Sequence, residues 1–202
     1  MMNKKKLLML ATAMATALPI SLATAATVQM HGKAMFRVAI ALSTTEMDFS
    51  KIDYTAAPSV VGDFVKIGTN NAELFGGVLS AGAGAVPAAG DVTLTAGTTG
   101  ETVGVKCAIS GVLANAAGKT INIIGVEVKD TDAGVGAFGT GNACNGIGGA
   151  NAQTKVLDGT DTFKFGGKID GSTTSNAGAG FGGQYDTSTA GGTNIQVDVV
   201  YQ

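Results

Sequence analysis

The sequence predicts an all-β protein: an antiparallel β-sandwich, Ig-like or pilin-like, with a long strand at its N-terminus. Glycine occurs 31 times in 202 residues, whereas proline occurs only 3 times and tryptophan is absent. Short apolar alternations recur roughly every 8 to 12 residues with glycine-rich turns between them, as in antiparallel sandwiches and barrels. No sequence stretch combines helical periodicity with capping residues over about ten positions, so helices are not expected.

Residues 1–25 are expected to be a secretory signal peptide that is removed from the exported protein. Three lysines at positions 4–6 precede an apolar run that ends at Ile20, and an A-x-A cleavage site ends at Ala25. A membrane anchor is the alternative, but the run is shorter than the roughly 18 residues that a span requires. Cleavage would leave 202 − 25 = 177 residues, the length of one ordinary domain.

The composition of the exported chain argues against several classes of function. Its 10 basic and 15 acidic side chains give a net charge of −5, and no basic stripe is present that would favour nucleic acid as a partner. No later segment is expected to span a membrane. Charged residues make up 14% of the chain, against about 25% in ordinary globular proteins, which is unlike a typical enzyme.

The two cysteines, Cys107 and Cys144, are expected to form one disulfide. Export places them in an oxidising compartment, where an even number of cysteines favours pairing. A metal pair is the alternative, but neither cysteine lies in a C-x-x-C motif and the single histidine, His31, is far away in sequence.

The longest alternation follows the signal peptide, and residues 26–42 are expected to form one N-terminal strand. Its polar face contains Gln29, His31, Lys33 and Arg37, and Gly32 interrupts the alternation on the other face, as a bulge would. The apolar face consists of Val28, Met30, Ala34, Phe36, Val38, Ile40 and Leu42.

The sandwich domain is expected to span residues 43–202. Within it, Gly125 interrupts an otherwise regular strand and predicts a β-bulge, and residues 131–153 form a Gly/Asn/Ala-rich loop around Cys144. Short apolar alternations predict strands within residues 46–56, 62–68, 72–82, 90–97, 100–111, 119–130 and 161–170.

The chain ends on a strand, "TNIQVDVVYQ", that has no polar tail. Ile195, Val197, Val199 and Tyr201 alternate and should face the core, and the hydroxyl of Tyr201 should find a hydrogen-bond partner. The neighbour expected for this strand is the segment from Lys33 to Leu42, of this chain or of another copy.

The chain lacks a recognisable catalytic constellation, and no enzyme activity, metal or cofactor is predicted. With His31 as the single histidine, no Ser-His-Asp arrangement can be assembled. Residues 134–139 satisfy G-x-G-x-x-G, but the following sequence cannot form the helix that a nucleotide site needs. Asp130 and Asp132 could offer oxygen atoms to calcium, but the loop lacks the EF-hand series, and turn-forming aspartates are the favoured interpretation.

Three stretches resemble the DUF4402 group of exported bacterial β-proteins and, more distantly, fimbrial subunits of the chaperone–usher type. They are "MDFSKI", "KFGGKID" and the closing "GGQYDTSTAGGTNIQVDVVYQ". The resemblance covers about a third of the exported chain directly. It implies a role at the cell surface or in a filament, and no catalytic activity.

The favoured function is therefore a structural subunit of an extracellular filament or surface layer, secreted through the periplasm. It would polymerise head to tail with copies of itself, by adding the N-terminal strand to the open sheet of a neighbour. A periplasmic chaperone and an outer-membrane assembly protein are possible partners. The alternative is a monomeric secreted β-sandwich module that binds carbohydrate or another surface ligand.

Overall fold

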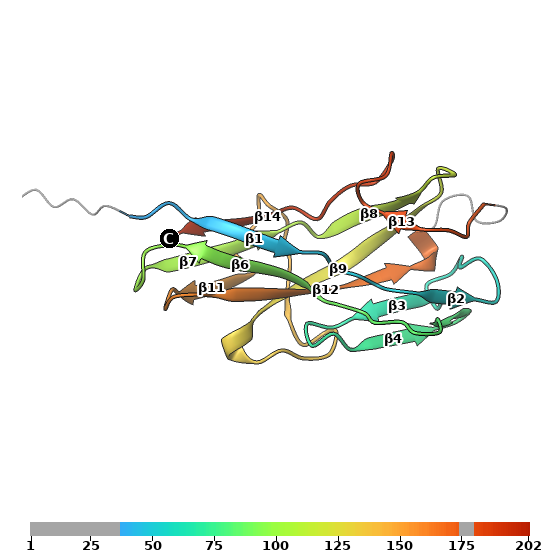
Figure 1. The fold of residues 1–202 in the computed structure, drawn as a ribbon, viewed down its shortest axis with the longest axis horizontal. Coiled ribbons are helices and arrows are strands. Elements are labelled where there is room, and N and C mark those ends of the chain that lie inside the picture. The colour runs from blue at the N-terminus through green and yellow to red at the C-terminus, as the bar shows by residue number, and fades with distance from the viewer. Residues whose placement is uncertain (1–36, 174–179) are drawn as a thin grey trace, which may run out of the picture. The chain divides into compact units, whose positions relative to one another are not determined.

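The computed structural model describes residues 37–173 and 180–202 (Figure 1). The predicted signal peptide and the part of the predicted N-terminal strand up to Phe36 lie outside these residues, and so does His31. The predicted all-β fold is confirmed, because strands and two short 3-10 turns, η1 (Thr131–Ala133) and η2 (Gly171–Thr173), make up the regular structure described. All strand pairs between described residues are antiparallel.

The largest sheet is built on β12, a central strand that lies between β6 and β9. Its main path runs β1-β6-β12-β9-β8-β13, with β3 attached to β12, β4 attached to β3 and β10 attached to β9. The bounds are β1 (Ala41–Thr45), β3 (Phe64–Ile67), β4 (Glu73–Gly76), β6 (Gly90–Ala96), β8 (Ser110–Asn115), β9 (Thr120–Asp130), β10 (Asn142–Ala143), β12 (Thr162–Asp170) and β13 (Tyr185–Asp186).

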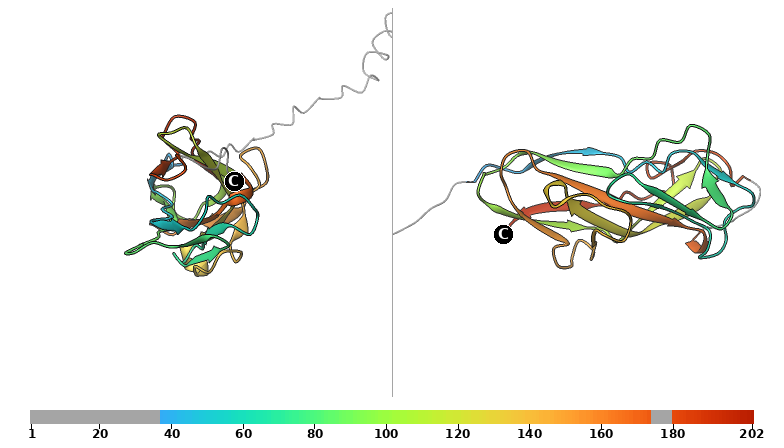
Figure 2. Two further views of the ribbon diagram at one scale, coloured as in Figure 1. Left: turned by 90° about the vertical axis from the view of Figure 1, so that its right-hand side faces the viewer. Right: turned by 90° about the horizontal axis from the view of Figure 1, so that it is seen from below.

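Two smaller sheets complete the fold. The first has the order β11-β7-β14, with β7 (Thr102–Cys107) between β11 (Gln153–Val156) and the last strand, β14 (Val197–Tyr201). The second pairs β2 (Ile52–Tyr54) with β5 (Leu79–Ala81). The end-on view shows the sheets curled around a common interior (Figure 2, left).

The core lies between the large sheet and the β11-β7-β14 sheet, as expected for a sandwich. Val103 and Val105 of β7 face Phe163 of β12, and all three side chains are fully buried. Alternation along the strands produces this arrangement, since Val92 and Leu94 of β6, and likewise Phe163 and Phe165 of β12, are buried two residues apart on one face of the strand. A continuous apolar layer therefore joins the two sheets.

The bulge predicted at Gly125 is present in β9. Gly166 pairs with Glu127 and Lys168 with Ile124, so Gly125 and Val126 together oppose the single residue Gly167. Gly125 has a φ of 58°, a left-handed conformation that glycine adopts without strain. The bulge lets β9 bend while it stays paired with β12.

The N-terminal boundary of the folded unit differs from the prediction. The compact unit begins at Arg37, six residues before the predicted start at residue 43. Leu42 lies in β1, which pairs with β6 of the same chain, and the side chain of Ile40 packs against the core. The end of the predicted N-terminal strand is thus part of the subunit's own sheet, because β6 offers it an edge.

Within the described residues, the last strand pairs with a neighbour other than the predicted segment of the same chain. β14 pairs with β7, Val199 opposite Val105, and its other edge forms no ladder with the described residues. Val199 is buried, whereas Ile195, Val197 and Tyr201 are half-buried. The segment around Val38 does meet this strand, but through the side chain of Tyr201 and not through a ladder.

Candidate functional site: a groove between the first and last strands

A groove of about 1000 Å³ lies between the chain that follows β1 and the chain that leads into β14. One wall is formed by residues 44–52 and Tyr54, and the other by residues 181–188 and the start of the last strand. The floor is apolar and comes from strands β6, β8, β9 and β12 of the large sheet, with Val92, Leu113, Ile121, Ile123, Phe165 and Ile169.

The first wall arises because the chain leaves the edge of β6 after Thr45. Beyond this point it makes a single bridge, between Asp48 and Ala88, before it joins β5 as β2. Ser50 has a φ of 55°, and its backbone N–H donates a hydrogen bond to Asp48 Oδ1 at 2.6 Å. This hydrogen bond stabilises the turn. The strand that would have continued beside β6 is therefore diverted across the end of the sheet.

The second wall arises because the chain before β14 is only sparsely paired. Thr193 bridges to Val112, and the N–H of Ala108 donates to the carbonyl of Gln196 at 2.8 Å. The regular ladder with β7 starts only at Val197. Residues 187–196 consequently follow β8 at its edge and leave the floor beside them uncovered by another strand.

The opposite end of the same two strands is closed by Tyr201. Its hydroxyl accepts from the N–H of Thr98 and donates to the carbonyl of Val38, both at 2.7 Å. Arg37 lies 4.9 Å above the tyrosine ring and pairs with Glu101 at 3.0 Å. We call these five residues the clasp; they tie the start of the described chain to the C-terminal strand, where Figure 1 places the C-terminus.

Three aromatic rings stand at the other end of the groove, where β2 and β13 lie (Figure 1). Phe181 packs between Tyr54 and Tyr185, with ring centroids 5.5 Å apart in both pairs. The hydroxyl of Tyr185 donates to the carbonyl of Phe181 at 2.6 Å, and burial raises the pKa of Tyr185 to about 12. Tyr54 is 45% exposed, so this end presents an aromatic surface.

The rims of the groove carry mostly acidic side chains. Glu46 and Asp48 stand on the first wall and Asp186 on the second, and Lys51 is the one basic residue in the described lining. Ser188 donates to Asp186 through its N–H and its hydroxyl, which lowers the pKa of that carboxyl. Asp91, the remaining acid of the lining, pairs with Lys164 at 2.6 Å.

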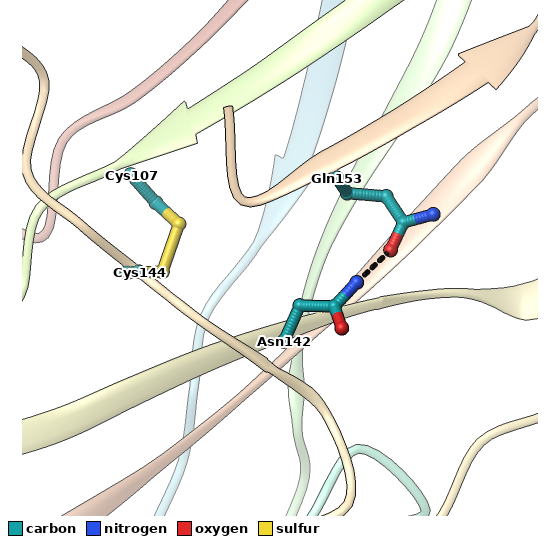
Figure 3. Close-up of a disulfide and its surroundings, with 4 residues drawn as sticks. All are labelled: Cys107, Asn142, Cys144 and Gln153. Atoms are coloured by element: carbon teal, nitrogen blue, oxygen red, sulfur yellow. Dashed lines mark hydrogen bonds between the residues drawn. A yellow bond between two sulfur atoms is a disulfide. The ribbon is translucent and has the colours of Figure 1, made fainter. Parts of the chain in front are cut away.

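Cys107 and Cys144 form a disulfide with a Cα–Cα distance of 5.1 Å (Figure 3). The bond joins the end of β7 to the residue after β10, and Asn142 donates from Nδ2 to Gln153 Oε1 nearby at 2.5 Å. Glu127 Oε2 accepts from the N–H groups of two loop glycines, 139 and 141. The loop predicted around Cys144 is thus held by a covalent bond and by a buried carboxylate.

A second polar cluster surrounds Lys155 on β11. Its ammonium contacts Asp132 and lies 3.0 Å from Asp161 and 3.3 Å from Asp130. Burial alone would lower the pKa of Lys155. The hydrogen bonds that its ammonium donates to Asp132 and Asp161 outweigh burial and raise the pKa. The carboxylates of Asp132, Asp158 and Asp161 are spaced closely enough for a cation, yet the lysine already supplies the positive charge among them.

The predicted turn role of Asp130 and Asp132 is confirmed, since Asp130 Oδ1 accepts from the N–H of Asp132 at 3.1 Å. Residues 134–139, which match G-x-G-x-x-G, lie in the loop between η1 and β10. Of the predicted polymerisation strand, Val28, Met30, Ala34 and Phe36 lie outside the described residues. Val38 is 56% exposed and Leu42 is 40% exposed, and Val38 belongs to the clasp.

The groove itself was not identified from the sequence. Its walls have no common motif, because residues 44–54 and 181–197 come together only through the sheet topology. One signal for the groove was present in the sequence: two of the stretches that carry the family resemblance, "MDFSKI" and the closing hairpin stretch, contribute to its opposite walls.

Comparison with protein-family models, curated proteins and solved structures finds no match to this chain. Among the described residues, no helix has the length and apolar character needed to cross a membrane.

Proposed function

We propose that the protein is a structural subunit of an extracellular filament, of the pilus or fimbria kind, or of a surface layer. Each copy would donate residues 26–36 as a strand to the groove of the next copy. The observation that carries this proposal is the groove over an apolar floor, bordered by the first and last strands. Strand addition buries alternate side chains of the incoming segment and lets its main chain pair with open strand edges.

The segment that precedes the described unit has a length and an apolar pattern that suit an added strand. Residues 26–36 number 36 − 26 + 1 = 11, as many as the wall from residue 44 to residue 54. Extended, 11 residues would reach about 36 Å at roughly 3.3 Å each. Alternate residues are apolar and suit the floor: Val28, Met30, Ala34 and Phe36.

The positions of the clasp and the groove favour head-to-tail assembly. Arg37 and Val38 are held at the clasp, beside the C-terminus, so the donated segment would leave the subunit from there. The groove extends along the other half, toward Tyr54 and Phe181. A contact between two different surfaces is heterologous and propagates as a filament unless rotation closes it.

The proposal includes the route of export. A signal peptide and a disulfide fit passage through the periplasm to the cell surface. Before assembly, the groove above the apolar floor would be unfilled, and a periplasmic chaperone could occupy it. An outer-membrane assembly protein would then exchange the chaperone for the strand of the next subunit.

The test compares the exported chain, residues 26–202, with a variant that cannot donate its strand, Val28→Asn/Met30→Asn. Electron microscopy and light scattering should show filaments or oligomers for the unsubstituted chain and monomers for the variant. A peptide of residues 26–36 should bind the variant and raise its unfolding free energy by about 2.7 kcal/mol at a hundredfold excess over Kd.

The matched control is Val61→Asn, which removes an apolar side chain that is 65% exposed and outside the groove. This variant should assemble like the unsubstituted chain. If the unsubstituted chain is monomeric and the Val28→Asn/Met30→Asn variant does not bind the peptide, strand donation is excluded.

The aromatic end of the groove favours a second candidate, a monomeric module that binds carbohydrate or another surface ligand. The ring of Tyr54 is 45% exposed and packs edge to face on the buried ring of Phe181, and an exposed ring of this kind can hold a sugar face. This function predicts saturable binding of a glycan by a monomer, and loss of that binding in Tyr54→Ala.

A further inference from the structure

We infer that the groove selects its strand by charge as well as by shape. Its acidic rims favour the acid-free, basic segment 26–36 of a second copy over a segment with the same apolar pattern and an acidic outer face. This inference rests on the proposed function and adds the property by which the correct strand is chosen.

The charge of the groove comes from both of its walls. Glu46 and Asp48 border one side and Asp186 the other, and none of the three belongs to an ion pair among the described residues. Asp91 is neutralised by Lys164, and Lys51 is the one base in the described lining. An incoming strand therefore passes between two negatively charged rims.

The proposed occupant has the complementary charge. Residues 26–36 contain Lys33 and His31 and no acidic residue. Both basic side chains fall on the polar face of the alternation, opposite Val28 and Met30. When the apolar face enters the floor, the polar face is directed outward between the rims, where the acidic side chains stand.

The rim charges should act mainly on the rate of association. Glu46 and Asp48 are exposed, so each pair that they form with a donated strand is screened by water and salt and adds little affinity. Opposite charges on two surfaces instead steer the encounter and raise the association rate at low salt. Like charges in the same places repel an incorrect strand before its apolar face can dock.

The experiment uses the donor-deficient exported chain, Val28→Asn/Met30→Asn, as the acceptor and two peptides of residues 26–36. One peptide has the natural sequence and the other carries Lys33→Glu. Binding rates are measured by surface plasmon resonance at low and high salt, with a scrambled peptide of the same composition as control. The same measurements are made with Glu46→Lys in the acceptor, since Glu46 is exposed and its side chain has no hydrogen bond or ion pair among the described residues.

At low salt, the natural peptide should associate about tenfold faster than Lys33→Glu with the natural rim, an effect of the size expected for steering. The difference should nearly disappear with the Glu46→Lys acceptor, whose rims then carry two acidic and two basic unpaired side chains, and it should shrink at high salt with the natural acceptor. If both peptides bind at equal rates to both acceptors, charge selection is wrong while strand donation stands. If neither peptide binds, or if the scrambled peptide binds equally well, the donated strand is wrong and charge selection falls with it.

Discussion

The first and last strands of the folded unit meet in two different ways along their length. At the clasp, Tyr201 connects the carbonyl of Val38 to the N–H of Thr98, and the core beneath is closed. At the groove, residues 44–54 and 181–197 separate and leave about 1000 Å³ above the floor. The same pair of chain segments is therefore complete at one end and open at the other.

The comparison shows where the fold obtains its stability and where it could gain more. Val103, Val105 and Phe163 are fully buried without any added strand, so the closed half has its own packed core. The side chains of the floor are at most 5% exposed, apart from the half-buried Leu113, but they border a cavity of about 1000 Å³ that an added strand would fill with further packing partners. Strand addition would consequently stabilise the open half far more than the closed half.

The sharpest test of this difference uses two phenylalanines of the same strand. Phe163 and Phe165 lie on the same face of β12, but only Phe165 lines the groove. Phe163→Ala should cost close to 5 kcal/mol of unfolding free energy, and Phe165→Ala about 3 kcal/mol, because the ring of Phe165 already borders a cavity. Denaturant unfolding measures both values.

The same pair also distinguishes the two halves by binding. In the donor-deficient chain, Phe165→Ala should lower the affinity for the peptide of residues 26–36. Phe163→Ala should leave that affinity unchanged under conditions in which the variant is folded. Equal losses of stability together with equal losses of affinity would mean that the core is one continuous unit, without an open half.

The disulfide should contribute almost as much to the stability of the folded chain. Cys107 and Cys144 are 37 residues apart, and a loop of this size constrains the unfolded chain by about 4 kcal/mol. The double variant Cys107→Ser/Cys144→Ser should lose this amount in denaturant unfolding and should still bind the peptide. The control is reduction of the natural chain, which should give the same loss; a variant as stable as the oxidised protein would contradict the prediction.

Tyr201 allows a smaller test, directed at the clasp alone. Tyr201→Phe removes the acceptor of the Thr98 N–H and the donor to the Val38 carbonyl, and should cost about 1 kcal/mol because the site is partly exposed. Hydrogen exchange should speed up at Thr98 and in β1, but not in β9. Tyr54→Phe is the matched control, since the Tyr54 hydroxyl has no hydrogen bond among the described residues; an equal loss there would show that Tyr201 does not act through the clasp.

Much of this arrangement followed from local patterns in the sequence. The alternation and the turn glycines predicted an antiparallel β-protein, and the displaced register around Gly125 predicted the bulge. These features are local, since each depends on residues close together in the chain. The two cysteines were paired for the same kind of reason, from their number and the compartment.

The contacts between distant segments could not be predicted in this way. The partner of β14 is set by which strand edge is free, and β7 takes that place instead of the segment near Leu42. The groove forms because the chain stops pairing with β6 after Thr45. No periodic pattern in the sequence predicts where that pairing ends. The cluster around Lys155 likewise joins aspartates from η1, β9 and the loop before β12.

The ionisation of Tyr185 has the smallest expected effect on stability at neutral pH. It is a specific probe of the open half, because Tyr185 lines the groove. Burial at the groove raises its pKa to about 12, above the ordinary value near 10 for an exposed tyrosine. Because the folded state favours the protonated hydroxyl, this contribution to stability is complete below about pH 10 and is lost as the pH rises through 12. Ultraviolet titration of the phenolate should show a late step that Tyr185→Phe removes. Peptide 26–36 should move that titration step to higher pH, because it would cover the groove and bury Tyr185 further. If the step occurs at the same pH with and without bound peptide, the peptide binds outside the groove.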